Sequence, residues 1–225
     1  MNDQNESTIS AKLKAPRAGA VAGILFSILL GICVVLLRLS VPDSPKDPGM
    51  WLANSARSVN LALGLLPFAG ITFLWFMGVL RDRMWEHEDR FLATVFLGSG
   101  FLFLAVVFAS SSISAALIMS YQAIPGRLME SATYTLARSF AYELTNSYAL
   151  RMAGVFMIST CTIDVRIHIF PRWIALLGFL LALFLIVTAG RWGWAPLVFP
   201  AWTFVVSAYI LFANFRPQPT VKAAA

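Results

Sequence analysis

The sequence predicts an all-α fold, a polytopic transmembrane helical bundle with six membrane helices and one amphipathic helix at the membrane surface. Hydrophobic residues make up 59% of the 225 residues and charged residues only 12%, whereas soluble domains carry about 25% charged residues. The stretch 81–90 is densely charged and lies between two long apolar runs. Because such a stretch cannot lie in hydrocarbon, the two runs must be separate spans joined at a membrane surface.

The first two spans are expected at residues 18–37 and 61–80, within one transmembrane domain that covers residues 17–215. Residues 1–16 are polar and are expected to form a disordered tail. Gly19 and Gly23 stand four residues apart, a spacing of small residues that lets a second helix approach closely, although glycine is common in membrane helices whatever its role. The proline-rich loop 38–60 is expected to be irregular.

The charged stretch that follows the second span suggests topology anchors. Arg81 and Arg83 come directly after the apolar run, where basic residues hold a span end at the membrane surface. His87 stands among acidic residues, but their spacing does not bring three ligands to one helix face, and no His-Glu-x-x-His motif is present. A solvated loop without a metal ion is therefore expected.

The third span is expected at residues 91–115 and should tilt or leave the membrane near the serines 110–112, because its apolar run exceeds the ~20 residues that a bilayer needs. A turn at 122–126 should follow. Residues 127–148 are predicted to form the amphipathic surface helix. Its apolar positions recur every four residues, at Leu128, Ala132, Leu136, Phe140 and Leu144.

The last three spans are expected at residues 150–170, 173–190 and 194–212, followed by a polar tail at 216–225. The fourth span is the most polar, and helical spacing puts Thr160, Asp164 and His168 on one face. Arg166 should point elsewhere and reach the headgroups. A buried carboxylate needs a partner or a proton, and ionisable groups inside a membrane are candidate functional groups. These three residues are the candidate polar site; a structural polar contact is the alternative.

The distribution of basic residues predicts that both termini lie in the cytoplasm. With this orientation the inner segments hold ten Lys and Arg residues and the outer segments hold seven, which is the direction of the positive-inside rule. The basic residues stand singly between apolar runs, so the net charge of +6 indicates membrane topology and no nucleic-acid partner. We expect a plasma (inner) membrane location.

Four stretches of the sequence carry a resemblance to a known group of proteins. Residues 76–83, 89–100, 151–160 and 171–178 resemble segments of small, uncharacterised, actinobacterial-type integral membrane proteins. The resemblance covers roughly residues 18–215. It implies a multi-pass bundle in a bacterial membrane and, because that family has no established activity, it implies no reaction.

The sequence favours a non-catalytic function. No nucleophile stands in a recognisable motif with a base, Cys33 and Cys161 lie singly in apolar runs, and no catalytic, metal or cofactor site is expected. The favoured interpretation is a subunit, assembly factor or envelope component that contacts the lipid bilayer and other membrane proteins or a second copy of itself. The alternative is a transporter or channel for a small solute, with or without proton coupling.

Overall fold

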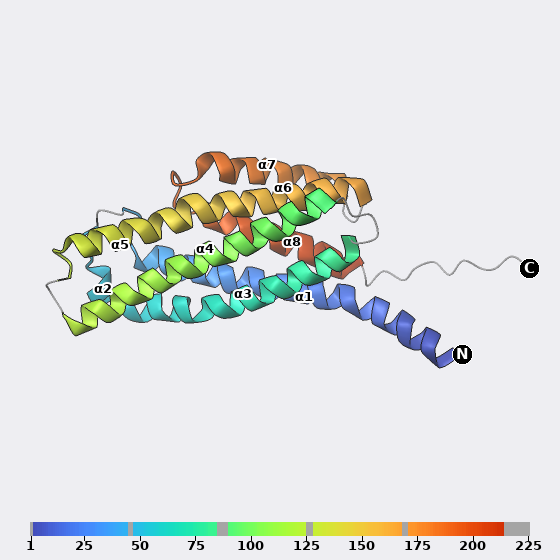
Figure 1. Ribbon diagram of the computed structural model, residues 1–225, viewed down its shortest axis with the longest axis horizontal. Coiled ribbons are helices and arrows are strands. Elements are labelled where there is room, and N and C mark those ends of the chain that lie inside the picture. The colour runs from blue at the N-terminus through green and yellow to red at the C-terminus, as the bar shows by residue number, and fades with distance from the viewer. Residues whose placement is uncertain (1, 45–46, 85–89, 125–127, 168–170, 214–225) are drawn as a thin grey trace, which may run out of the picture.

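The chain folds into a bundle of long helices, and its described residues contain no strand (Figure 1). The computed structural model describes residues 2–44, 47–84, 90–124, 128–167 and 171–213. The elements in chain order are α1 (Asn2–Ser40), α2 (Trp51–Asn54), α3 (Ala56–Met84), α4 (Arg90–Ala123), α5 (Ala132–Glu143), a π-helical segment (Leu144–Ala149), α6 (Leu150–Ile167), α7 (Arg172–Thr188), a short 3-10 helix (Ala195–Leu197) and α8 (Val198–Ala213). The start of α1 and the end of α8 lie at the same end of the bundle, on the right of Figure 1. We call the opposite end the distal end.

The helices identify a membrane-embedded protein. Five segments are long and apolar enough to cross a bilayer, at residues 18–40, 56–82, 90–123, 132–166 and 195–213. The sixth apolar helix, α7, has 17 residues, which corresponds to about 26 Å at ~1.5 Å per residue and is the lower end of the usual range for a span. The all-α bundle that composition predicts is therefore confirmed.

The largest departures from the predicted spans are at the start of α1 and at the end of α4. Helix α1 begins at Asn2, so residues 2–16 are helical and not the disordered tail that their polarity suggested. Helix α4 continues through the serines to Ala123. Its serine hydroxyls bond to carbonyl groups one turn back, as Ser111 does to Val107 O at 2.7 Å and Ser112 to Phe108 O at 2.9 Å. Because these bonds stay inside the helix, the serines do not end it.

The surface helix expected at residues 127–148 is instead the first part of one continuous helix. Helix α5, the π-helical segment and α6 follow one another without a break from Ala132 to Ile167, a stretch without proline. The face that the four-residue spacing favoured is also the outer one: Leu136 is 72% exposed and Phe140 is 56% exposed. The side of α5 packed into the protein carries Tyr134, Arg138 and Ala141.

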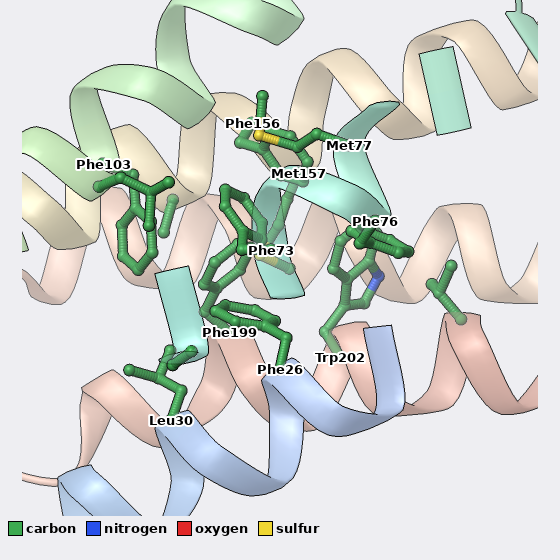
Figure 2. Close-up of a cluster of buried hydrophobic side chains, with 14 of the residues drawn as sticks. Phe26, Leu30, Phe73, Phe76, Met77, Phe103, Phe156, Met157, Phe199 and Trp202 are labelled. Atoms are coloured by element: carbon green, nitrogen blue, oxygen red, sulfur yellow. The ribbon is translucent and has the colours of Figure 1, made fainter. Parts of the chain in front are cut away.

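Interlocked aromatic rings fill the middle of the bundle (Figure 2). Phe26 of α1, Phe73 of α3, Phe103 of α4, Phe156 of α6 and Phe199 of α8 are all buried. The Phe26 and Phe73 ring centroids are 4.6 Å apart, and those of Phe103 and Phe199 are 4.9 Å apart. These separations suit tilted and edge-to-face packing. We call these five residues the phenyl cluster; it joins five helices at one level.

A second, smaller core lies at the distal end. It is built from buried side chains of α2, α4, α5 and the segments beside them: Trp51, Leu52, Val59, Leu117, Ile118, Leu128 and Tyr134. Trp51 Nε1 donates a hydrogen bond to the Tyr134 hydroxyl at 3.1 Å. We call this unit, residues 47–59, 112–123 and 128–143, the distal cap.

The distal cap extends beyond the shortest membrane helices. Helix α4 has 34 residues, or about 51 Å, against a hydrocarbon thickness of about 30 Å. Figure 1 shows α5 and the last turns of α4 reaching past the turn between α7 and α8, on the left. At the distal end α4 and α5 therefore extend farther than α7 and α8.

Candidate functional site

The polar site predicted on the fourth span lies partly inside the bundle. Asp164 is 3% exposed and Thr160 is 1% exposed, both on α6, whereas Arg166 is exposed. The Thr160 hydroxyl donates to the Phe156 carbonyl at 2.8 Å, within its own helix. His168, the third member of the predicted site, lies outside the described residues. Asp164 and Thr160 thus share the buried face that their four-residue spacing requires.

The predicted packing glycines lie where α1 meets its neighbours. A Cβ added at Gly19 would stand 2.6 Å from Val79 Cβ of α3, and one added at Gly23 would stand 2.7 Å from Phe76 Cδ2. Gly23 also faces the Ser207 hydroxyl of α8. These glycines therefore allow α1 to lie against two helices at once.

The predicted topology anchors lie at the end of α3. Arg81 is half-buried there. Arg83 belongs to the same helix, but its side chain lies outside the described residues, as does the whole of His87. Within the described ranges, no three His, Cys, Asp or Glu side chains come together as metal ligands.

A cavity of about 130 Å³ lies between the phenyl cluster and the distal cap. Its walls come mainly from α1, α3, α4, α5 and the π-helical segment, with single residues of α2, α6, the 3-10 helix and α8. One part of the wall is apolar and includes Leu63, Leu66, Phe103, Val107 and Phe199. The other part is polar and includes Arg38, Ser110, Arg138, Thr145 and Asn146. The cavity therefore has an apolar side and a polar side.

Arg38 joins the end of α1 to the π-helical segment. Its guanidinium forms an ion pair with the Asp43 carboxylate and donates to Oδ1 of Asn146. Asn146 is buried and donates in turn to the Tyr142 carbonyl at 3.0 Å. The charge of Arg38 is thus balanced by a neighbouring acid.

Arg138 carries the other guanidinium of the cavity wall and has no such balance. Its side chain is 8% exposed, and Nη2 donates to the Pro42 carbonyl at 2.7 Å. Its Nε is buried and has no hydrogen-bond partner. Among the described residues no carboxylate lies within ion-pair distance of Arg138; Asp47 lies in its electrostatic range but accepts a hydrogen bond from the Gly49 N–H at 2.8 Å.

The hydroxyl groups of the polar wall are engaged with one another and with backbone carbonyls. Ser110 Oγ donates to Ala141 O at 2.8 Å and lies 2.7 Å from Thr145 Oγ1, so Thr145 donates to Ser110. Ser114 donates to Ser110 O at 3.0 Å. These bonds join α4 to α5 and the π-helical segment. Because each hydroxyl already donates its proton, it has none left to donate to a ligand.

The described wall of the cavity offers groups that can bind a ligand. Its thiol, Cys33, donates to Ala62 O at 3.3 Å and has no base beside it in the described wall. A π-helical segment often marks a functional position in a helix, and here it supplies Thr145 and Asn146 to the cavity. The cavity therefore offers a ligand charged side chains, a few fixed dipoles and an apolar wall.

Sequence reasoning missed this cavity. In the predicted topology Arg38 and Arg138 are two of the seven basic residues of the outer segments, and no pattern marks Asn146. A signal was present at Arg138, since Tyr134, Arg138 and Ala141 lie one turn apart and share a face of α5. The prediction instead took the more apolar face, which carries Leu136 and Phe140, as the one that contacts the membrane. Arg138 was thereby expected on the solvent side.

Comparison with known proteins adds no relative. No protein-family model matches the chain, and no curated protein or solved structure shows significant similarity to it.

Proposed function

We propose that this chain is a non-catalytic membrane protein that acts by binding other membrane proteins, as a subunit, assembly factor or envelope component. The observation that carries the proposal is the apolar outer face of α5 in the distal cap. Leu136 and Phe140 are largely exposed and stand four residues apart, so their side chains are neighbours on the helix. We further propose a bacterial plasma membrane as the location, with both termini in the cytoplasm and the distal cap outside.

The position of this face distinguishes it from the lipid-facing surface of the bundle. Exposed Leu, Ile and Phe side chains on α1, α3 and α7 meet acyl chains, where apolar residues belong. The distal cap stands beyond the hydrocarbon, where an exposed Leu–Phe pair meets water unless another protein covers it. Met119 is 70% exposed on the same cap and adds to its apolar area. Exposed apolar patches of this kind are characteristic of protein contact sites.

Site-specific photo-crosslinking tests this proposal. A photoreactive amino acid at Phe140 should give a protein adduct of defined mass in native membranes. Thr133 is exposed on the same helix but lies outside the apolar pair. The photoreactive amino acid in place of Thr133 should give no protein adduct. A third position, Leu180 on the outer face of α7, should give only lipid adducts. Equal yields of protein adduct at all three positions would refute a specific contact at the cap.

A transporter remains the second candidate because polar groups occur on both sides of the phenyl cluster. Asp164 lies toward the terminal end and the cavity with Arg138 lies toward the distal end. In this conformation the five rings separate the two sites, so solute passage would need the cluster to open. Proton or solute flux into liposomes that contain only this protein, abolished by Asp164→Asn, would support transport over the binding function.

A further inference from the structure

We propose that the cavity between the phenyl cluster and the distal cap binds a singly charged anionic amphiphile. Its acidic head would lie on Arg138 and its hydrocarbon part among Leu63, Leu66, Phe103 and Val107. This proposal is independent of partner binding at α5, because it concerns the opposite, buried face of that helix.

The charge of Arg138 is the first argument. Removing a guanidinium from water is costly unless an opposite charge accompanies it. In the described part of the chain, the backbone carbonyl of Pro42 is the hydrogen-bond acceptor of Arg138. A carbonyl dipole does not neutralise a cation. A bound anion would supply the missing charge, and Arg is the side chain best shaped to hold a carboxylate or phosphate.

An unpartnered donor on Arg138, a residue of the cavity wall, gives the second argument. Nε of Arg138 is buried without a partner, whereas the protons of Ser110, Thr145 and Ser114 are already donated to other groups. The hydroxyl and carbonyl oxygens around it are acceptors, which would repel an anion placed elsewhere on the wall. Among the groups of the wall, the guanidinium of Arg138 is therefore where we place the anionic head.

The number of charges follows from comparing the two arginines. Arg38 is paired with Asp43, whereas Asp47 acts on Arg138 only from beyond ion-pair distance. One positive charge without an ion-pair partner among the described residues favours one negative charge in the ligand. A carboxylate and a phosphodiester both meet this condition, so a fatty acid and an anionic phospholipid share the required chemistry.

The apolar wall and the size of the cavity indicate that the ligand also has a hydrocarbon part. A free inorganic anion would leave the apolar side of the wall empty. An engineered apolar cavity of about 150 Å³ holds a benzene molecule, so about 130 Å³ accommodates the first few carbons of a chain. With the distal cap placed outside the hydrocarbon, as proposed above, the cavity lies at the edge of the membrane and the rest of the ligand's chain can continue into lipid.

The test uses the full-length protein in phosphatidylcholine nanodiscs and follows its thermal unfolding midpoint. Octanoate, which has both charge and chain, should raise the midpoint in a saturable manner. Octanol has the chain without the charge and acetate has the charge without the chain; neither should reproduce the shift. If the head contacts Arg138 through charge-assisted hydrogen bonds, Arg138→Gln should weaken octanoate binding at least about tenfold.

A matched variant and a cavity-filling variant separate binding from folding. Arg151→Gln removes an exposed arginine of the adjoining helix and should leave the octanoate shift unchanged. Val107→Phe fills the apolar side while retaining Arg138 and should abolish the shift. The comparison of octanoate with octanol and acetate on the unaltered protein needs no variant, so the test stands even if one of them fails to fold.

The lipid source is distinguished in the same experiment. If the natural ligand is a phospholipid, nanodiscs containing phosphatidylglycerol should raise the midpoint of the unaltered protein and block the octanoate shift, and Arg138→Gln should remove both effects. If it is a fatty acid, phosphatidylglycerol should not compete. A cavity that holds only water would give equal, unsaturable responses to octanoate and octanol with both lipids, and that result would overturn the proposal.

Discussion

Helix α1 lies close to its neighbours at Gly23 but not at Gly31. Alanine substitutions at these two positions should therefore differ in their effect on stability. A methyl group at Gly23 would stand 2.7 Å from Phe76 Cδ2 and would also collide with the Ser207 hydroxyl, whereas one at Gly31 would meet no atom within 4 Å. Phe76 is 1% exposed, so its ring cannot move without disturbing the bundle. Gly23→Ala should therefore separate α1 from α3 or α8.

The magnitude follows from two opposing effects. Alanine is favoured over glycine inside a helix by up to about 1 kcal/mol, a gain that both variants share. Overpacking a filled interior costs about 1–3 kcal/mol, a loss that only Gly23→Ala incurs. We expect Gly23→Ala to be less stable than Gly31→Ala by about 1–3 kcal/mol.

Thermal unfolding in mild detergent, followed by the fluorescence of the seven tryptophans, measures this difference. Gly31→Ala should melt at or slightly above the midpoint of the unaltered protein, and Gly23→Ala should melt below it. If the two variants melt together, α1 is not held against α3 and α8 at Gly23 as the structure describes.

Three further outcomes are expected. Asp164→Leu should lower the melting midpoint more than Arg166→Leu, because Asp164 is buried and Arg166 is exposed; equal midpoints for both variants would argue against a structural role for the buried carboxylate. Ser110→Val removes the hydrogen bonds that join α4 to α5 and the π-helical segment and should cost about 1–2 kcal/mol, whereas Ser112→Ala loses only a bond within its own helix and should cost less in the same melting assay. A periplasm-active reporter fused after Ala225 should stay inactive if the C-terminus is cytoplasmic, and strong activity of a stable fusion would reverse the proposed orientation.

Composition and apolar runs were sufficient to predict the bundle, because the cost of exposing peptide groups to hydrocarbon leaves helices as the available structure for a span. The four-residue spacing of a helix also indicated which residues share a face. Gly19, Gly23 and Asp164, which this spacing singled out, are all buried. The ends of the helices were predicted less well. Apolar character marks where lipid begins and ends, whereas a helix continues as long as its hydrogen bonds do, as α4 continues past Ser112.

The cavity could not be predicted from single elements because its polar groups come from distant parts of the chain. Arg38 meets Asn146 across 108 positions, and Arg138 meets Pro42 across 96. Neither pair forms a local motif. Each arginine in isolation resembles a basic residue at a membrane surface. The folded structure shows that Arg38 is paired with Asp43, whereas Arg138 is buried with no carboxylate within ion-pair distance among the described residues.

One continuous helix contributes to both cores, the distal cap through α5 and the phenyl cluster through α6. The buried positions of α5 are Tyr134, Arg138 and Ala141, and a regular α-helix would continue that face through residue 145. In the π-helical segment Asn146 and Ala149 are buried, and half-buried Thr145 bonds to Ser110. The polar wall of the cavity lies along this helix between the two cores, and the facing walls come from α1, α3 and α4. A helical period read on one segment therefore cannot reveal the cavity, because the period says nothing of the helices that face it.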